Sequence, residues 1–188
     1  MSLRRMLCGS AVLLGAGCGD ADGPVESTRT SRLEFTYGGA VSGTFQAVGE
    51  HASTPGQTSA WTYGQRLTQS GAVRILASSP IVSGKSDQVT LGIARLTPGS
   101  ETFGVCGNYC TLLGLGMGVK DAGGFDWACN VTSGTATLTS LTQRRAVGTF
   151  SGSGECYASG SFDPAPFTVS NGSFDVLIQN DLAASRSP

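Results

Sequence analysis

Charged side chains are scarce in this sequence. Lysine, arginine, aspartate and glutamate make up 13% of the 188 residues, and the formal net charge at pH 7 is −1. No basic stripe stands out, which argues against nucleic acid as a partner. Histidine is rarer still: His51 is the only one, so a metal site built from several histidines is excluded.

Motifs of common enzyme classes are also missing. No serine lies in a Gly-x-Ser-x-Gly elbow, and no Cys-x-x-Cys redox pair occurs. Residues 79–86 end like a phosphate-binding loop, but Ser79 stands where that loop needs glycine. Asp121 and Asp126 flank a glycine-rich segment that we interpret as a solvated turn rather than a calcium loop. We therefore expect no enzyme, no cofactor and no metal site.

Long helical patterns are absent from the chain. Short runs rich in β-forming residues recur instead, separated by glycine, proline and polar turn residues. The prolines within this region fall between the runs, as they must in a sheet. The runs predicted as strands are 33–37, 40–48, 60–67, 72–77, 88–96, 111–119, 131–142, 146–152, 160–162, 167–170 and 173–179.

These runs predict one all-β domain over residues 32–181, followed by a disordered tail at 182–188. We expect an antiparallel β-sandwich of about ten strands, with a closed β-barrel as the alternative. The sandwich is preferred because a simple up-and-down barrel would show more even strand lengths.

A glycine, a serine or threonine and a phenylalanine follow one another at residues 43–45, 148–150, 160–162 and 172–174. Each phenylalanine is expected to point inward from a strand. Asn171 and Gly172 stand between two alternating runs and predict a hairpin. A second hairpin is predicted with its turn at residues 143–145, where Arg144 and Arg145 would be solvated.

Four cysteines lie in the predicted domain, and an even number in an exported protein indicates disulfides. The register of the second hairpin brings Cys129 within two positions of Cys156, with a bulge at Gly152 or Gly154 absorbing the slip. We therefore predict the disulfides Cys129–Cys156 and Cys106–Cys110. A four-cysteine zinc site is the less favoured alternative, because two of the four lie 27 residues apart.

The run LGLGMGV, residues 113–119, has an unusual pattern. Its large residues share one face, while Gly114, Gly116 and Gly118 leave the other face bare. The favoured interpretation is that Phe125 or Trp127 packs across this strip. The functional alternative is a shallow groove in which a flat ligand, such as a sugar ring, approaches the backbone.

That groove would need aromatic side chains as stacking faces. Tyr109 is one candidate from the sequence. The possible ligand surface comprises Trp61, Tyr63, Gly114, Gly116, Gly118 and Trp127.

Residues 1–17 have the features of a leader. Arg4 and Arg5 give it a positive start, residues 6–17 carry no charge, and small residues precede Cys18. Its apolar stretch is too short to span a bilayer, which takes about 20 residues. The leader resembles a bacterial lipoprotein signal peptide, although Gly15 stands where leucine is usual.

The resemblance implies that Cys18 is lipidated and becomes the first residue of the mature chain. Residues 18–31 would then form the lipid-bearing cysteine and a flexible tether, since 19–31 are small and polar. Gly19 follows the cysteine where an aspartate would favour the inner membrane, which implies the outer membrane or cell surface. The alternative is an ordinary secretory leader cut near Ala21.

Taken together, these features predict a lipid-anchored binding or interaction module of the cell envelope, with the membrane as one partner. Its ligand would be an envelope protein or a glycan. Two alternatives are a structural accessory subunit of an outer-membrane complex and a hydrolase of envelope polysaccharide. The first function explains the anchor, the tether, the cross-linked scaffold and the missing catalytic residues.

Overall fold

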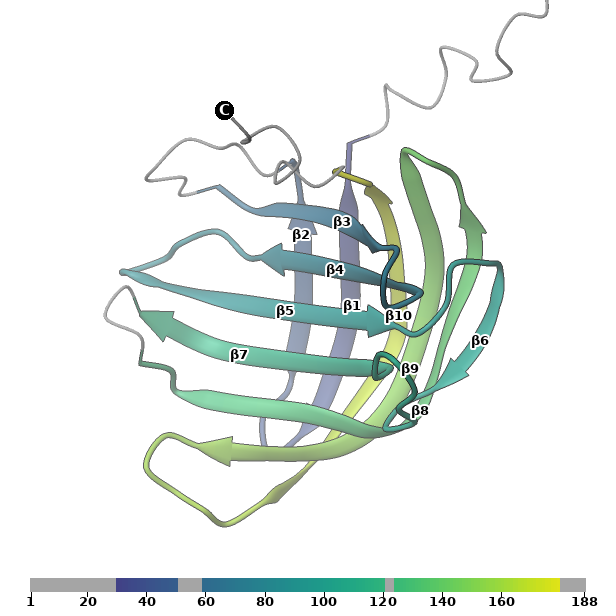
Figure 1. Ribbon diagram of the computed structural model, residues 1–188. Coiled ribbons are helices and arrows are strands. Elements are labelled where there is room, and N and C mark those ends of the chain that lie inside the picture. Colours follow the sequence, from purple (N-terminus) through teal and green to yellow (C-terminus); the bar gives the residue numbers. More distant parts are fainter. Residues whose placement is uncertain (1–29, 51–58, 121–123, 180–188) are drawn as a thin grey trace, which may run out of the picture.

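The computed structural model describes residues 30–50, 59–120 and 124–179 (Figure 1). This part of the chain contains ten strands and no helix, which confirms the predicted all-β antiparallel fold. The predicted signal peptide, Cys18, most of the tether, His51 and the tail at 182–188 lie outside the described residues. The strands are β1 (Arg32–Gly39), β2 (Gly43–Val48), β3 (Trp61–Leu67), β4 (Ala72–Ser78), β5 (Lys85–Ile93), β6 (Gly99–Thr102), β7 (Leu112–Lys120), β8 (Trp127–Leu141), β9 (Arg145–Ala158) and β10 (Ala165–Leu177).

All ten strands belong to one sheet that is nearly closed into a barrel. The order is β2-β1-β10-β9-β8-β7-β5-β4-β3, with β6 paired to β8 beside this path. The two ends of the sheet approach each other at β3, where Gly64 bridges Ile178 and the Thr62 amide donates to the Gly49 carbonyl oxygen at 2.9 Å. In Figure 1, β3, β4, β5 and β7 cross in front of β1 and β2.

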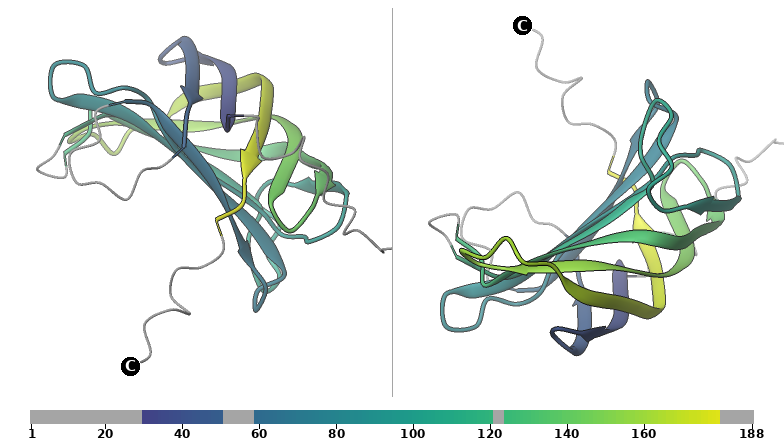
Figure 2. Two further views of the ribbon diagram at one scale, coloured as in Figure 1. Left: turned by 90° about the horizontal axis from the view of Figure 1, so that it is seen from above. Right: turned by 90° about the horizontal axis from the view of Figure 1, so that it is seen from below.

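The barrel is therefore the alternative that the chain adopts, and not two separate sheets. Uneven strand lengths pointed to a sandwich, but in this fold they have another cause. The three longest strands, β8, β9 and β10, contain 15, 14 and 13 residues and bend around the barrel. Figure 2 shows this rolled shape from above and below.

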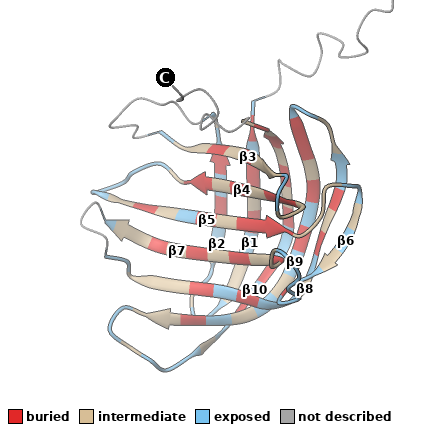
Figure 3. Ribbon diagram, in the orientation of Figure 1, coloured by how far each residue is buried: buried red, intermediate tan, exposed pale blue. Residues whose placement is uncertain are grey.

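Side chains fill the inside of the barrel. Buried and less buried positions alternate along the strands, as Figure 3 shows. Phenylalanines form much of the core: Phe35 stacks on Phe45 with ring centroids 5.2 Å apart and meets Phe150 edge-on at 5.6 Å. Aromatic pairs of this kind add about 0.5–1.5 kcal/mol beyond the area that they bury.

Both predicted disulfides are present. Cys129 and Cys156 are direct partners of the β8–β9 ladder, and Cys106 and Cys110 close a short loop between β6 and β7. The closed end of the hairpin pairs Leu141 with Ala146.

The register of this hairpin then changes twice toward the disulfide. The shifts lie at 138–140 and at 131–133, and each adds one residue on the β8 side. The prediction of a bulge at Gly152 or Gly154 was therefore wrong: the extra residues lie in β8 and not in β9.

The prediction of a hairpin at Asn171 and Gly172 is also wrong. These residues lie inside β10, where the register with β9 shifts between Val169 and Gly172. Asn171 has a φ of 54°, but Gly172 has no positive φ. A two-residue type I′ turn needs positive φ at both central residues, so this pair makes a bulge instead.

Two further expectations fail at strand ends. The run 160–162 is not a strand, and Phe162 is 95% exposed in the connection between β9 and β10. Arg145 is not solvated as expected: it is 5% exposed, and its guanidinium donates to the Asp175 carboxylate of β10. Arg144 at the tip is exposed, as predicted.

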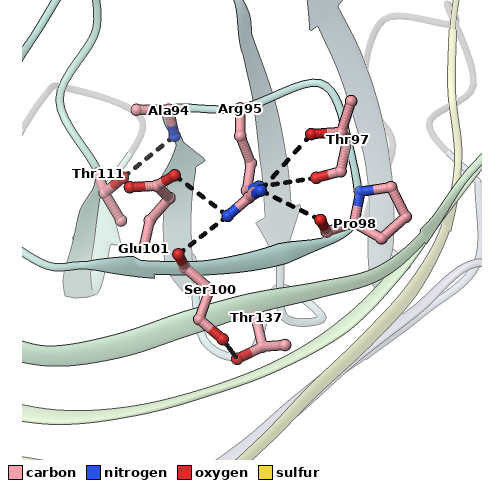
Figure 4. Close-up of polar contacts among 8 residues, drawn as sticks. All are labelled: Ala94, Arg95, Thr97, Pro98, Ser100, Glu101, Thr111 and Thr137. Atoms are coloured by element: carbon pink, nitrogen blue, oxygen red, sulfur yellow. Dashed lines mark hydrogen bonds and ion pairs between the residues drawn. The ribbon is translucent and has the colours of Figure 1, made fainter.

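The short strand β6 escaped the sequence analysis, and Arg95 orders the segment that leads to it. Its guanidinium donates to the carbonyl oxygens of Thr97, Pro98 and Ser100 at 2.7, 3.1 and 2.9 Å, and to Glu101 Oε1 at 3.2 Å (Figure 4). With Thr97 Oγ1 at 3.5 Å, five acceptors converge on one guanidinium, so this connection is fixed by a single side chain.

Candidate functional site

The outer surface of the sheet carries two rows of residues that run across the strands from β3 to β9. The pairing registers define both rows, because directly opposed residues on neighbouring antiparallel strands face the same side. The first row is Trp61, Ser78, Gln88, Gly116, Ala128 and Tyr157. The second row is Tyr63, Leu76, Thr90, Gly114, Asn130 and Glu155. We call this surface the outer face.

The β3 end of the outer face is aromatic. Trp61 and Tyr63 are two residues apart on one strand, and their rings stack with centroids 5.6 Å apart and planes inclined by 28°. Both side chains are half-buried. At the opposite end, the Tyr157 hydroxyl donates to Glu155 Oε2 at 2.9 Å, and this hydrogen bond raises the pKa of Tyr157 above its ordinary value.

Between these ends, the two rows contain the glycines Gly114 and Gly116 and no charged side chain. A Cβ placed on Gly114 would lie 3.5 Å from Asn130 Oδ1, and one on Gly116 would lie 3.1 Å from a Val119 methyl group. No aromatic ring is among the atoms nearest to either glycine. Gly114 therefore leaves the backbone of β7 accessible beside the side chain of Thr90, whereas Val119 covers Gly116, and both glycines are half-buried.

The favoured interpretation of the glycine strip, packing by Phe125 or Trp127, is therefore wrong for Gly114 and Gly116. Trp127 pairs with Met117 and packs against the core, which places it on the inner side of the sheet. Phe125 is 40% exposed. Aromatic rings cover other glycines instead: the ring of Tyr109 would lie 2.7 Å from a Cβ on Gly92 of β5, and the ring of Phe174 would lie 2.4 Å from one on Gly148.

Gly118 also differs from its two neighbours in the strip. It has a φ of +63°, and the register between β5 and β7 shifts at this point. The shift turns Val119 to the outer face, although the sequence pattern had placed it with the buried residues. Trp61, Tyr63, Gly114 and Gly116 thus share one surface, while Gly118 and Trp127 belong to another site.

A hollow deepens the outer face next to its first row. This cavity of ≈ 280 Å³ is bounded by Trp61 of β3, Gln88 of β5 and Val119 of β7, and by the connection between β4 and β5. Its polar lining comes from Ser78, Ser86 and Lys120 among others. Sequence analysis missed Gln88 as part of this surface, although strand parity with Thr90 would have placed it there.

The other two predicted residues line a larger cavity of ≈ 520 Å³ at one end of the barrel. We call it the mouth pocket. Tyr37 of β1, Asp87 of β5, and Gly118 and Trp127 lie around it. No motif in the sequence singled out Asp87 or Tyr37, because their proximity depends on the closure of the sheet.

Two further properties hold for the part of the chain that the structure describes. Histidine, cysteine, aspartate and glutamate form no group of three or more that could hold a metal ion. In the same residues, no helix is long and apolar enough to cross a bilayer.

Comparison of the chain with protein-family models, with curated proteins and with solved structures found no match.

Proposed function

We propose that the protein is a lipid-anchored module of the cell envelope that binds a glycan on its outer face. The observation that carries this proposal is the joining of the Trp61–Tyr63 stack to the accessible backbone at Gly114 by continuous ladder registers. A sugar ring has an apolar face that packs on aromatic rings and hydroxyl groups that need hydrogen-bond partners. The outer face offers both.

The dimensions and the charge of the outer face support an extended, neutral ligand. Adjacent strands lie about 4.8 Å apart, so the five spacings from β3 to β9 cover roughly 24 Å. Glu155 is the one side chain of the two rows that is charged at neutral pH, and Lys120 adds one positive charge at the hollow beside the first row. Gln88, Thr90 and Asn130 supply amide and hydroxyl groups along the way.

The anchor in this proposal rests on the leader, with small residues before Cys18 and a polar segment after it. Two disulfides in the folded part agree with an oxidising compartment outside the cytoplasm. We therefore propose the outer membrane or cell surface as the location, with the folded domain held on a tether.

The anchor is tested by replacing Cys18. A Cys18→Ser chain should lose radiolabelled fatty acid and leave the membrane fraction, whereas a Cys8→Ser chain should keep both properties. A Cys18→Ser chain that still carries acyl label in the membrane would refute the anchor.

Glycan binding is tested by removing the aromatic stack. The full chain is mixed with purified peptidoglycan sacculi, with lipopolysaccharide and with cellopentaose and chitopentaose as neutral soluble oligosaccharides. The Trp61→Ala/Tyr63→Ala variant should bind at least about tenfold more weakly, since stacking by two rings contributes more than 1.4 kcal/mol. Phe162→Ala removes an exposed aromatic ring from a distant loop and should bind as the unaltered chain does. Equal binding by the two variants would exclude the outer face.

The accessory-subunit alternative draws on one observation. Phe162 and Val82 are 95% and 69% exposed at connections between strands, where each is available to contact another protein. Cross-linking of the full-length protein in intact cells, followed by mass spectrometry, distinguishes the two functions. Recovery of one stoichiometric envelope protein would favour the subunit, whereas recovery of no specific protein would favour the glycan.

The hydrolase alternative would need a carboxylic acid that stays protonated near neutral pH. Asp87 and Asp126 do line one cavity. However, Lys85 lowers the pKa of Asp126, and Arg32 lowers the pKa of Glu34. This direction is the opposite of what a general acid requires.

A further inference from the structure

The mouth pocket meets the hollow of the outer face at Ser86, which lines both, but its other walls differ and combine two kinds of side chain. It forms where the end of β1, the start of β5, the end of β7 and the start of β8 meet. Its walls are aromatic at Tyr37 and Trp127 and apolar at Met117, and Asp87 contributes a carboxylate. Its volume of ≈ 520 Å³ accommodates a small organic group.

The charges around the pocket leave one carboxylate without a counterion. Lys85 Nζ lies 2.7 Å from Asp126 Oδ2, and Lys120 Nζ lies 3.5 Å from Asp126 Oδ1. Both lysines are therefore engaged with Asp126. Within the described residues, no cationic nitrogen lies within 4.0 Å of Asp87.

Asp87 is nevertheless held in a fixed position. The Gly118 amide donates to its Oδ1 at 3.0 Å, and its own backbone amide donates to Ser79 Oγ at 2.8 Å. Its second oxygen, Oδ2, has no donor among the described residues. An ionised carboxylate that is partly withdrawn from water calls for a further donor or a positive charge.

The aromatic walls favour a positive charge over a neutral donor. The face of an aromatic ring attracts cations, most strongly for tryptophan. Tyr37 stays a neutral phenol, because burial and the nearby Asp87 charge raise its pKa above the ordinary value.

We propose that the mouth pocket binds an alkylammonium group, which donates to the Asp87 carboxylate and lies against the rings of Trp127 and Tyr37. A metal ion fits this site poorly, since the described residues supply no group of three or more carboxylate, thiolate or imidazole ligands. We infer that the ammonium group belongs to a lysine side chain of a protein, because Val41, Val82 and Met117 give apolar walls for its methylene chain; an ethanolamine head group is the other outcome of the test.

The test is a titration of the full chain in detergent with butylammonium, followed by the NMR signals of the Gly118 amide and the Trp127 indole. The neutral analogue 1-butanol and the anion butyrate serve as controls of the same size. Both signals should shift saturably with butylammonium and should not shift with either control. Equal shifts with 1-butanol, or no shift with butylammonium, would overturn the proposal without any substitution.

Two variants test whether Asp87 supplies the negative charge that binds the ammonium group. Asp87→Asn keeps an oxygen for the Gly118 amide and should weaken butylammonium binding about tenfold. Asp163→Asn removes an exposed carboxylate from the connection between β9 and β10 and should leave binding unchanged. Equal affinities in the two variants would overturn the role of Asp87.

The source of the ammonium group is identified with two further probes. Tighter binding of Nα-acetyl-lysine amide than of phosphoethanolamine would assign the site to a protein side chain. The reverse order would assign it to a lipid head group. Failure of glycan binding would leave this result intact, since Asp87 and Trp127 are not part of the outer face.

Discussion

Gly118 links the conformation of β7 to the mouth pocket. Its φ of +63° lies in the left-handed region, and a Cβ there would come within 2.3 Å of Asp126 Oδ2 and 3.1 Å of Asp126 Cβ. Its amide also donates to Asp87. One residue without a side chain thus permits the bulge, the position of Asp87 and the approach of Asp126.

Gly118→Ala should therefore lower the free energy of unfolding by about 1–2 kcal/mol, the cost of left-handed backbone for a residue with a Cβ. Urea denaturation followed by intrinsic fluorescence measures the effect. Gly107→Ala is the matched control, because it has open space around its Cβ position and no positive φ. If Gly118→Ala lowers the free energy of unfolding no more than Gly107→Ala does, the left-handed backbone at Gly118 does not strain a residue with a Cβ.

The ion pair of Asp126 predicts a pH dependence. Lys85 holds the pKa of Asp126 below its ordinary value of about 3.9. The pair therefore stabilises the folded state above about pH 4, and this contribution disappears as the pH falls through the lowered pKa. Asp126→Asn should be slightly less stable than the unaltered chain at pH 7 and equally stable at pH 2.

Thermal unfolding at both pH values checks this expectation. Because Asp126 is an exposed group, the difference at pH 7 should shrink in 1 M salt. A difference that is larger at pH 2 than at pH 7 would contradict the sign of the shift.

At the residue scale, the sequence predicts the alternation of buried and exposed side chains along the strands. It does not predict the residues that depart from this alternation. Phe45, Phe150 and Phe174 of the recurring motif are buried as expected, whereas Phe162 is exposed. The motif records a local preference for strand, but burial depends on whether a neighbouring strand is present. Near Phe162 the chain makes a turn, with the Ser161 amide donating to the Ala158 carbonyl oxygen.

At the scale of elements, the β8–β9 hairpin carries the disulfide that closes the longer loop. Cys129 and Cys156 are 2% and 0% exposed, and their bond closes a loop with a sequence separation of 27. The Cys106–Cys110 bond spans a separation of 4. In the chain-entropy model, loops of these lengths stabilise by about 3.5 and about 2 kcal/mol.

Cys129→Ala/Cys156→Ala should therefore destabilise the domain more than Cys106→Ala/Cys110→Ala. The alanines leave space where buried sulfur atoms stood, which adds to the entropic loss. Guanidinium denaturation of both variants measures the difference. A larger loss for the Cys106–Cys110 variant would show that its loop, which holds Tyr109 against Gly92, matters more than the hairpin.

The elements also show why sequence could predict the disulfide pairs but not every strand. The turn near Gln143 fixed the hairpin register to within two residues, which was close enough to pair Cys129 with Cys156. By contrast, β6 pairs with β8 next to the Arg95 network, and no local pattern records that contact. Asn171 and Gly172 were misread because a bulge and a tight turn use the same residue types.

At the scale of the whole molecule, the strand pattern predicted the fold class, but closure of the sheet determined the sites. The outer face was partly foreseen, since Trp61, Tyr63, Gly114 and Gly116 lie on one surface. The sequence analysis assigned Trp127 to the wrong side of the sheet. The side that it faces depends on the β7–β8 register, which no turn motif fixes. The mouth pocket needs β1 and β5 at one end of the barrel, a long-range arrangement without a local signature.

The central claim is that the open backbone at Gly114 receives the ligand. Gly114→Thr places its Cβ at an ordinary contact distance, 3.5 Å from Asn130 Oδ1, and threonine favours strands. Gly38→Thr on β1 is the matched control, with its Cβ position 3.4 Å from Thr168 Oγ1.

The most direct measurement compares the binding of these two variants and the unaltered chain to the glycan panel of sacculi, lipopolysaccharide, cellopentaose and chitopentaose. We expect the unaltered chain and Gly38→Thr to bind equally and Gly114→Thr to bind at least about tenfold more weakly, with an unchanged unfolding midpoint. Equal binding by Gly114→Thr, or no binding of any glycan by the unaltered chain, would contradict the account.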